Sequence, residues 1–319
     1  MSDETKENIF KITQTFLSNP PLIVWGSGAT ISFGLPSMED LNKKLKEKIK
    51  NFNVTNNNLE TELEKDKYNE DLLEIKKIIW EAVYESDNEV LKSIVSNDVD
   101  KFNGIKLLIN KVLDIHPKVL NIVTTNYDRV LEYVMSYNNI SFTDGFNGKT
   151  LSIFNEDAFQ KKNIVNLLKV HGSLNWFNQD GKVRFIPCVL ENSIPKIIVP
   201  SKKKYEEGYD SPYRELIQKT DSLIKDASSF LVIGFGFNDR HLTPRIKAEI
   251  NQGTPIVLIT KKVSENSFTE LERAEKNILF EEAKSGKTKV ICKENKQSDK
   301  KEYEIEGAFW QLNEFMEII

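Results

Sequence analysis

Residues 21–36 read PLIVWGSGATISFGLP, and this stretch decides the fold. It starts with a short apolar run, residues 22–25, which predicts a buried strand. The strand is followed directly by a glycine-rich turn that consists of Gly26, Ser27, Gly28, Ala29 and Thr30. Because glycine has no side chain, backbone N–H groups in such a turn can approach a diphosphate. The stretch therefore predicts a nucleotide-binding turn at a strand end, and a tight turn without a ligand is the alternative.

The glycine spacing does not match the fingerprint of dinucleotide-binding dehydrogenases. That fingerprint, G-x-G-x-x-G, requires another glycine three residues after Gly28. Ile31 stands at that position, and the next glycine is Gly34. The turn is a weak signal on its own, and its meaning depends on the other predicted strands.

Three further apolar runs end in small or polar residues. They are residues 119–125, before Asn126, Tyr127 and Asp128; residues 164–170, before His171 and Gly172; and residues 230–233, before Gly234, Phe235, Gly236, Phe237, Asn238 and Asp239. Strands are also predicted at 255–259 and near 289–292, with helical patterns between the runs. This alternation predicts an α/β fold with a Rossmann-like, doubly wound, mostly parallel sheet. Ligands of such sheets bind beyond the carboxyl ends of the strands, so we expect one nucleotide site at a common rim.

Apolar residues at helical spacing predict most of the remaining structure. Helices are expected before Pro20, after Ser37, and at the C-terminus, where Phe309 and Phe315 share one helix. Between about residues 51 and 115, a polar stretch is followed by apolar residues at helical spacing, which predicts a helical insertion. Because no repeat or linker composition interrupts the chain, we expect residues 1–319 to form a single domain with this insertion.

Composition restricts the class of protein. The formal net charge of −4 argues against direct nucleic-acid binding, despite a basic cluster at 202–204. No apolar run is long enough to span a membrane, and acidic residues stand where a signal peptide would be positive, so a cytoplasmic protein is expected. The two cysteines, Cys188 and Cys292, are too few for a disulfide framework or a four-cysteine zinc site, and no metal is expected.

Taken in order, the strand-end motifs resemble the NAD-binding motifs of the sirtuin superfamily. They are the glycine-rich turn with Gly34-Leu35-Pro36, then Thr125-Asn126-Tyr127-Asp128, His171-Gly172 and Gly234-Phe235-Gly236-Phe237. The chain looks most like the sirtuin-like (Sir2-like) effector domains of bacterial anti-phage defence systems, which degrade NAD. The resemblance extends from about residue 21 to residue 292.

The resemblance implies NAD as the substrate. The implied nucleotide-binding residues are Gly26, Ser27, Gly28, Ala29, Thr30, Asp128, Gly234, Phe235, Gly236 and Asp239, the last of which would border the adenosine ribose. The implied catalytic residues are Asn126 and His171. Protein deacetylases of the family have a four-cysteine zinc module and a Phe-Arg pair where this sequence has Met38-Glu39. Hydrolysis of NAD+ is therefore expected rather than deacetylation.

The side chains at the two implied catalytic positions suit cleavage of the N-glycosidic bond of NAD+. Nicotinamide leaves as a neutral amide, so the protein has to orient water and remove a proton rather than supply one. The Asn126 amide can orient water or a ribose hydroxyl, and the His171 imidazole can accept a proton. The alternatives are a core histidine at position 171 and, for Asp128, a helix cap.

A hydrolase that was always active would destroy the NAD of its own cell. We therefore expect control by homo-oligomerisation or by a separate partner, which in the resembling systems is a HerA-type ATPase or a short Argonaute-like protein. The alternative function is a module that senses NAD or an NAD derivative without turning it over. The presence of both Asn126 and His171 favours the hydrolase.

Overall fold

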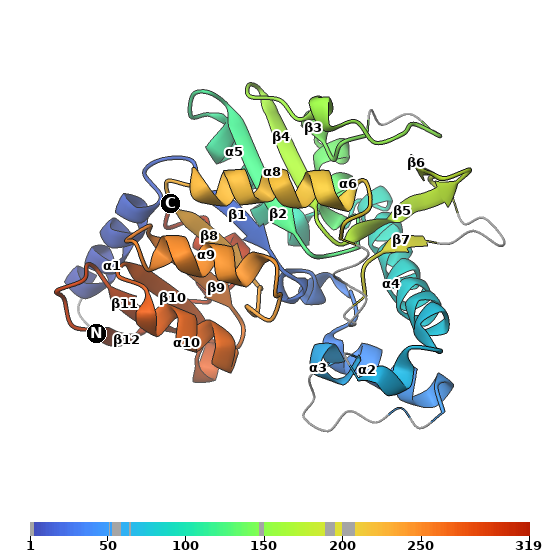
Figure 1. Cartoon of the computed structure of the whole chain (residues 1–319). Coiled ribbons are helices and arrows are strands. Elements are labelled where there is room, and N and C mark those ends of the chain that lie inside the picture. The colour runs from blue at the N-terminus through green and yellow to red at the C-terminus, as the bar shows by residue number, and fades with distance from the viewer. Residues whose placement is uncertain are drawn as a thin grey trace.

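The computed structural model describes residues 3–50, 52, 59–63, 65–146, 150–188, 195–199 and 208–319 (Figure 1). The basic cluster at 202–204 and part of the polar stretch after residue 50 lie outside these residues. The large sheet contains β1 (Leu22–Trp25), β2 (Val119–Thr124), β3 (Phe142–Thr143), β4 (Ile164–Lys169), β8 (Phe230–Ile233), β9 (Ile256–Thr260), β10 (Asn277–Glu282), β11 (Lys287–Lys293) and β12 (Lys301–Glu306). Its order is β12-β11-β10-β9-β8-β1-β2-β4-β3.

The large sheet is mostly parallel. All neighbouring pairs from β10 to β3 are parallel, whereas β11 and β12 are added antiparallel. The register pairs Trp25 of β1 with Thr124 of β2 and with Ile233 of β8, and it pairs Thr124 with Lys169 of β4. The carboxyl ends of these four strands therefore lie side by side at one rim. The predicted α/β fold with a mostly parallel sheet is confirmed.

Side chains of the central strand alternate between two apolar layers, as the period of a strand requires. Ile23 and Trp25 face one layer, and Leu22 and Val24 face the other. The first layer includes α1 (Asp3–Phe16), α2 (Met38–Lys48), α3 (Leu59–Leu63), α4 (Leu72–Val95), α5 (Asn103–Leu113), α6 (Val130–Tyr137) and α11 (Leu312–Phe315). The second includes α8 (Tyr213–Lys225), α9 (Leu242–Ile250) and α10 (Glu265–Arg273), and Figure 1 shows α8 and α9 crossing in front of the strands. Helices on both faces explain why β1 is apolar throughout.

A small antiparallel sheet follows β4, and the sequence analysis did not predict it. It consists of β5 (Gly172–Gln179), β6 (Lys182–Phe185) and β7 (Pro195–Ile197), in the order β6-β5-β7. Gly172 joins β4 to β5 with a φ of +87°, and a side chain there would collide with the carbonyl group of Lys196. Only glycine suits this position. The sharp turn leaves His171 at the rim of the large sheet.

The C-terminal part differs from the prediction in two respects. The strand expected near 289–292 is β11, but it is preceded by β10 and followed by β12. The predicted C-terminal helix is reduced to the single turn of α11. Helices α3, α4 and α5 lie between β1 and β2 in the chain. The description of residues 1–319 as one domain with an insertion at about 51–115 stays a prediction.

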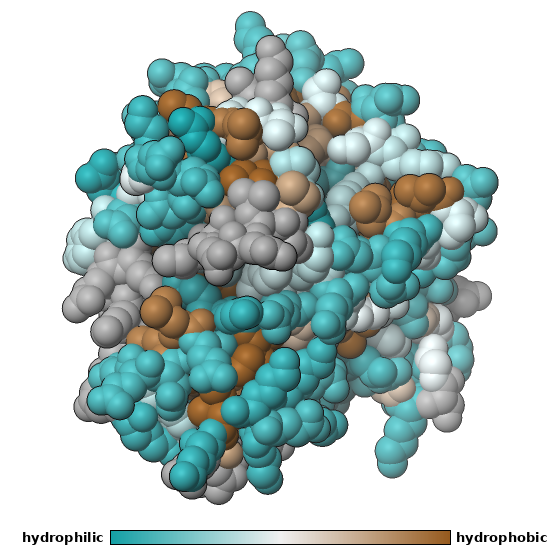
Figure 2. Space-filling view, turned by 90° about the vertical axis from the view of Figure 1, so that its right-hand side faces the viewer, coloured by the Kyte–Doolittle hydropathy of each residue, from teal (hydrophilic) through white to brown (hydrophobic). Residues whose placement is uncertain are grey.

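Figure 2 shows the face on the right-hand side of Figure 1 as mainly hydrophilic, with hydrophobic residues in separate clusters. The large hydrophobic side chains that are exposed include Leu73, Val95, Leu151 and Tyr209. None of the described helices has both the length and the apolar character that a membrane span requires.

Candidate functional site

A pocket of about 660 Å³, which includes space open to solvent, lies at the rim where β1, β2 and β4 end. Its polar lining comes from the loops that follow these strands, and consists of Ser27, Thr30, Thr125, Asn126, Tyr127, Asp128 and His171. Five of the predicted site residues therefore share one cavity, although they are far apart in the sequence. Gly26, Gly28 and Ala29 belong to the loop that contributes Ser27 and Thr30, but they do not line the cavity.

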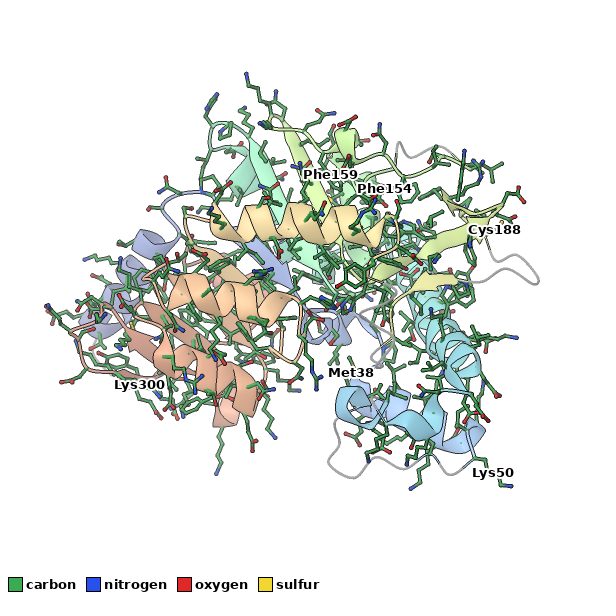
Figure 3. All side chains as sticks on the ribbon, in the orientation of Figure 1. Met38, Lys50, Phe154, Phe159, Cys188 and Lys300 are labelled. Carbon is green, nitrogen blue, oxygen red and sulfur yellow. The ribbon has the colours of Figure 1, made fainter. Side chains whose placement is uncertain are left out.

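The rest of the pocket lining is mainly apolar. Leu35 and Pro36 follow the glycine-rich turn, and α2, α3 and α4 contribute Met38, Leu41, Leu59, Ile79 and Val83. Figure 3 labels Met38, which lies at the start of α2. Leu35 and Pro36 belong to the first strand-end motif, but the sequence analysis assigned no site role to the helical residues, because apolar positions on helices usually pack in a core. A pocket with both a polar and an apolar lining suits a ligand that carries hydroxyl groups and a ring.

The two glycine-rich turns pack backbone against backbone. The N–H group of Gly28 donates a hydrogen bond to the carbonyl oxygen of Gly234 (2.9 Å). A side chain at Gly26 would collide with the Gly234 carbonyl, and a Cβ at Gly28 would lie 2.8 Å from the same oxygen. These glycines are therefore required for the contact between the turns. Gly234 and Phe235 adjoin the first turn in this way, and neither they nor Gly236 line the pocket.

Asn126 is buried, and its side chain is bonded to the loop that follows β1. Its backbone N–H donates to Oγ1 of Thr124 (3.0 Å), and its side-chain Nδ2 donates to the carbonyl of Gly26 (3.2 Å) and to Oγ1 of Thr30 (3.4 Å). Its Oδ1 is buried and accepts no hydrogen bond from the described residues. A buried acceptor without a partner is costly, so a ligand hydroxyl or a water in the pocket would gain from donating to Oδ1.

Asp128 is both a helix cap and a pocket residue. Its Oδ1 accepts from the N–H of Val130 at the start of α6 (3.2 Å), and its Oδ2 accepts from Oγ1 of Thr30 (3.4 Å). Burial raises the pKa of Asp128 to about 7, against the attraction of the Lys169 ammonium. The carboxyl group is therefore partly protonated near neutral pH. In that form it can donate a hydrogen bond as well as accept one.

Asp128 should make the stability of the protein depend on pH. Its carboxyl pKa rises from 3.8 to about 7 on folding, so the folded state binds the proton more tightly. The stability that this proton contributes is complete below about pH 4 and is lost as the pH rises through 7. Asparagine does not titrate, so the difference in unfolding free energy between Asp128→Asn and the wild type should change with pH. We expect this difference to shift by at least about 1 kcal/mol in favour of Asp128→Asn as the pH rises from about 5 to about 8, measured by urea unfolding.

The control for this measurement is Asp98→Asn. A hydrogen bond from Lys101 holds the pKa of Asp98 below its usual range, so that carboxyl group stays ionised over the whole interval. Its difference from the wild type should therefore not change with pH. A difference that is equally constant for Asp128→Asn would contradict the assigned protonation of Asp128.

His171 contacts an acidic residue from the distant β8–α9 loop. Its carbonyl oxygen accepts from the N–H of Ile198 (2.8 Å), and its ring Nε2 lies 3.0 Å from Oδ2 of Asp239. The other carboxylate oxygen of Asp239 accepts from the N–H groups of His241 and Leu242 and caps α9. We expected Asp239 at an adenosine ribose, but its carboxylate contacts His171 and does not line the pocket.

A buried ion pair ties α4 to the residues that follow Asn126. The guanidinium of Arg129 donates to Oδ2 of Asp87 through Nε (2.9 Å) and Nη2 (2.6 Å), and its backbone N–H donates to Oδ1 (2.6 Å). The hydroxyl of Tyr133 donates to the same carboxylate (2.7 Å). The sequence analysis missed this pair, because charged residues within helical patterns usually face solvent. The Asp128-Arg129 sequence next to a predicted strand end was the available signal.

The comparison with known families agrees with these motifs. The family model described as "SIR2-like domain" matches residues 120–283, slightly more than half of the chain. The chain belongs to the SIR2-like domain family. The matched segment of this SIR2-like chain extends from β2 through β10 and contains Asn126, His171 and Gly234, whereas the turn at Gly26 precedes it.

Several solved structures are similar to this SIR2-like chain. One comes from work on the mechanism and regulation of Sir2 enzymes, with 12% identity, a TM-score of 0.44, and coverage of 83% of this chain and 88% of that chain. A second, from work on sirtuin substrate affinity, has 14% identity, a TM-score of 0.44 and coverage of 83% and 90%. A third is Sir2 bound to an acetylated peptide, with 13% identity, a TM-score of 0.43 and coverage of 80% and 88%. No curated protein sequence matches the chain.

Proposed function

We propose that this SIR2-like chain is an NAD+ glycohydrolase that cleaves NAD+ to nicotinamide and ADP-ribose. The observation that carries the proposal is the pocket that brings Asn126 and His171 together with Ser27, Thr30 and Asp128. The motif resemblance to NAD-degrading sirtuin-like domains implies the same two catalytic residues. A set of polar groups from three strand ends suits a substrate that spans several loops.

The two kinds of pocket lining match two parts of NAD+. The glycine-rich turn after β1 brings the Ser27 and Thr30 side chains to the pocket, where their hydroxyl groups suit the diphosphate. Leu41, Ile79 and Val83 supply an apolar surface suited to the nicotinamide ring. That surface also excludes water from the leaving group, so that water reaches the ribose only where polar groups hold it.

Cleavage breaks the bond between the nicotinamide nitrogen and C1′ of the ribose. The bonding electrons leave with the pyridinium, which becomes neutral nicotinamide, and positive charge builds up on the ribose. A water molecule then bonds to C1′ and loses a proton. The buried Oδ1 of Asn126 can accept a hydrogen bond from that water or from a ribose hydroxyl and so orient it. His171 accepts the proton that is released.

Two other functions fit the family but have less support in this chain. A lysine deacylase of the usual sirtuin form needs a four-cysteine zinc module, whereas this sequence contains only Cys188 and Cys292. The described residues also contain no group of three or more His, Cys, Asp and Glu side chains that could hold a metal ion. The second alternative, a sensor that binds NAD or an NAD derivative without turnover, requires no catalytic pair. It differs from the hydrolase in one observable, the release of nicotinamide.

The proposed biological role is that of a cytoplasmic effector in anti-phage defence, which acts by depleting NAD+. This role follows from the motif resemblance and from the consequence of unregulated hydrolysis for the cell. Activity would be controlled by homo-oligomerisation or by a separate partner such as a HerA-type ATPase or a short Argonaute-like protein.

The choice of NAD over other nucleotides can be tested by thermal shift. A ligand that binds only the folded state raises the melting temperature, and the rise is larger the more its concentration exceeds its Kd. We expect NAD+ to stabilise the protein more than ATP or a flavin nucleotide at equal concentration, because the four strand-end motifs together resemble those that bind NAD. Stabilisation by ATP without stabilisation by NAD+ would rule out the proposed substrate. His171→Ala, which retains the glycine-rich turn, serves as a slow-turnover form for the titration.

A further inference from the structure

Lys169 is a wholly buried lysine next to the candidate site. It is the last residue of β4, two positions before His171, and its exposed fraction is 0%. Its Nζ lies 2.5 Å from Oε1 of Glu132 and 2.5 Å from the carbonyl oxygen of Asp128, and 3.4 Å from the carbonyl oxygen of Tyr127. An ammonium group has three N–H donors, so its full donor capacity is directed at these three acceptors.

Two of the three acceptors belong to the loop that carries Asn126. We name residues 125–129 the rim loop; this segment is neither helix nor strand. Carbonyl groups in such a loop have no ladder partner, and their orientation depends on other donors. Beyond Lys169, the Tyr127 carbonyl accepts from the N–H of Leu174 (3.1 Å). Lys169 thus links the carbonyls between Asn126 and α6 to the rigid strand β4.

A buried ammonium group is energetically unfavourable at this position. Taking a charge out of water costs several kcal/mol, which an ion pair offsets only when its geometry is good and its remaining donors are satisfied. The other side chains of β4 are apolar except for Asn166, and an apolar residue at 169 would avoid that cost. The bonds to the rim loop provide a functional reason for the charge.

We propose that Lys169 is a positioning residue that fixes the rim loop, and so holds Asn126 and Asp128 at the pocket. The part of this inference that concerns turnover rests on the proposed NAD+ hydrolysis; the part that concerns the loop does not. Lys169 does not line the pocket, so it acts through the loop and not on the substrate. Its loss should lower kcat, while the glycine-rich turn continues to bind NAD+.

The competing explanation is that Lys169 only neutralises Glu132. The two explanations separate in a double variant, Lys169→Met with Glu132→Met. Replacing both members of a buried ion pair with apolar residues is often neutral or stabilising, whereas removing one member leaves an unpaired buried charge. The double variant therefore restores charge balance without restoring the hydrogen bonds to the carbonyls of Tyr127 and Asp128.

The experiment compares Lys169→Met, the double variant and a control, Asn166→Leu. Asn166 is a buried polar residue of the same strand, and its side chain bonds to Asn121 and Gln160, away from the rim loop. Melting temperature, kcat and KM for NAD+ are measured, together with hydrogen exchange of peptides that cover residues 124–132. We expect the control to lose stability but keep the wild-type loop exchange and kcat.

In the double variant we expect the melting temperature to recover relative to Lys169→Met, while loop exchange stays faster than in the wild type. Its kcat should remain about tenfold or more below the wild type with KM within about threefold, since small displacements of catalytic groups have effects of this size. Recovery of both loop exchange and kcat would overturn the proposal. If the wild type shows no turnover but the double variant exchanges faster in the loop, the positioning role stands and hydrolysis fails. Unchanged loop exchange in both Lys169 variants overturns the positioning role, whatever the turnover.

Discussion

Replacing Asn126 or His171 with alanine is expected to lower nicotinamide release from NAD+ by about 10² or more, which is typical for positioned polar and acid–base groups. Asn126→Ala removes the buried Oδ1, which accepts no hydrogen bond from the described residues, and so leaves the attacking water without an orienting group. His171→Ala removes the group that takes the proton. NAD+ affinity should stay within about tenfold of the wild type in both variants, because neither residue belongs to the glycine-rich turns. The readouts are steady-state turnover and calorimetric titration with NAD+.

The matched controls for these variants lie outside the pocket. His116→Ala removes an exposed histidine from the loop before β2, and Asn138→Ala removes an asparagine whose side chain donates to the carbonyl of Val134. Both should retain wild-type turnover. If the wild type shows no turnover, and His171→Ala lowers only the affinity for NAD+, the result would instead support the sensor.

Replacing Gly26 with alanine is expected to impair both folding and NAD+ binding. Its Cβ would collide with the carbonyl of Gly234 and with Cα of Phe235, so the two glycine-rich turns have to separate. Overpacking against backbone of this kind costs about 1–3 kcal/mol of unfolding free energy. We expect NAD+ affinity to fall by about tenfold or more, because the separated turn no longer holds Ser27 and Thr30 at the pocket. Urea unfolding and calorimetric titration measure the two effects.

Gly181→Ala is the control for Gly26→Ala. Gly181 lies in the turn between β5 and β6 with a φ of +76° and open space around it. Alanine there should cost about 1 kcal/mol through backbone strain, with no change in NAD+ affinity. If Gly26→Ala lost stability but bound NAD+ as tightly as the wild type, the turn after β1 would not be the diphosphate site.

The large sheet could be predicted because each of its central strands can be recognised from a short segment of sequence. Each central strand is a short apolar run that ends at glycine or at a polar residue, and helices on both faces make such runs apolar throughout. The small sheet was not predictable in the same way. Its first strand, β5, begins at the motif residue Gly172, and its pairing with β7 depends on a distant segment. The sequence analysis also did not predict β12, because Lys301, Glu302 and Glu304 give this edge strand the composition of a polar loop.

The pocket was predictable in its polar half and not in the remainder. Strand-end motifs name Asn126, Asp128 and His171, and parallel register brings them together. The contact between Asp239 and His171 depends on the path of the β8–α9 loop, which the sequence does not specify. Lys169 lies within an apolar run, and the sequence alone cannot show which carbonyls its ammonium reaches.

The most direct test of the central claim is to follow free nicotinamide and ADP-ribose by chromatography while the purified protein is incubated with NAD+, alone and with the proteins encoded beside it. Asn126→Ala, treated identically, provides the background. The proposed function predicts that wild-type protein, alone or with its partner, releases nicotinamide and ADP-ribose in equal amounts at about 10² or more times the background rate. Wild-type protein that binds NAD+ but never exceeds the Asn126→Ala background under any of these conditions would contradict hydrolysis and leave the sensor as the function of the site.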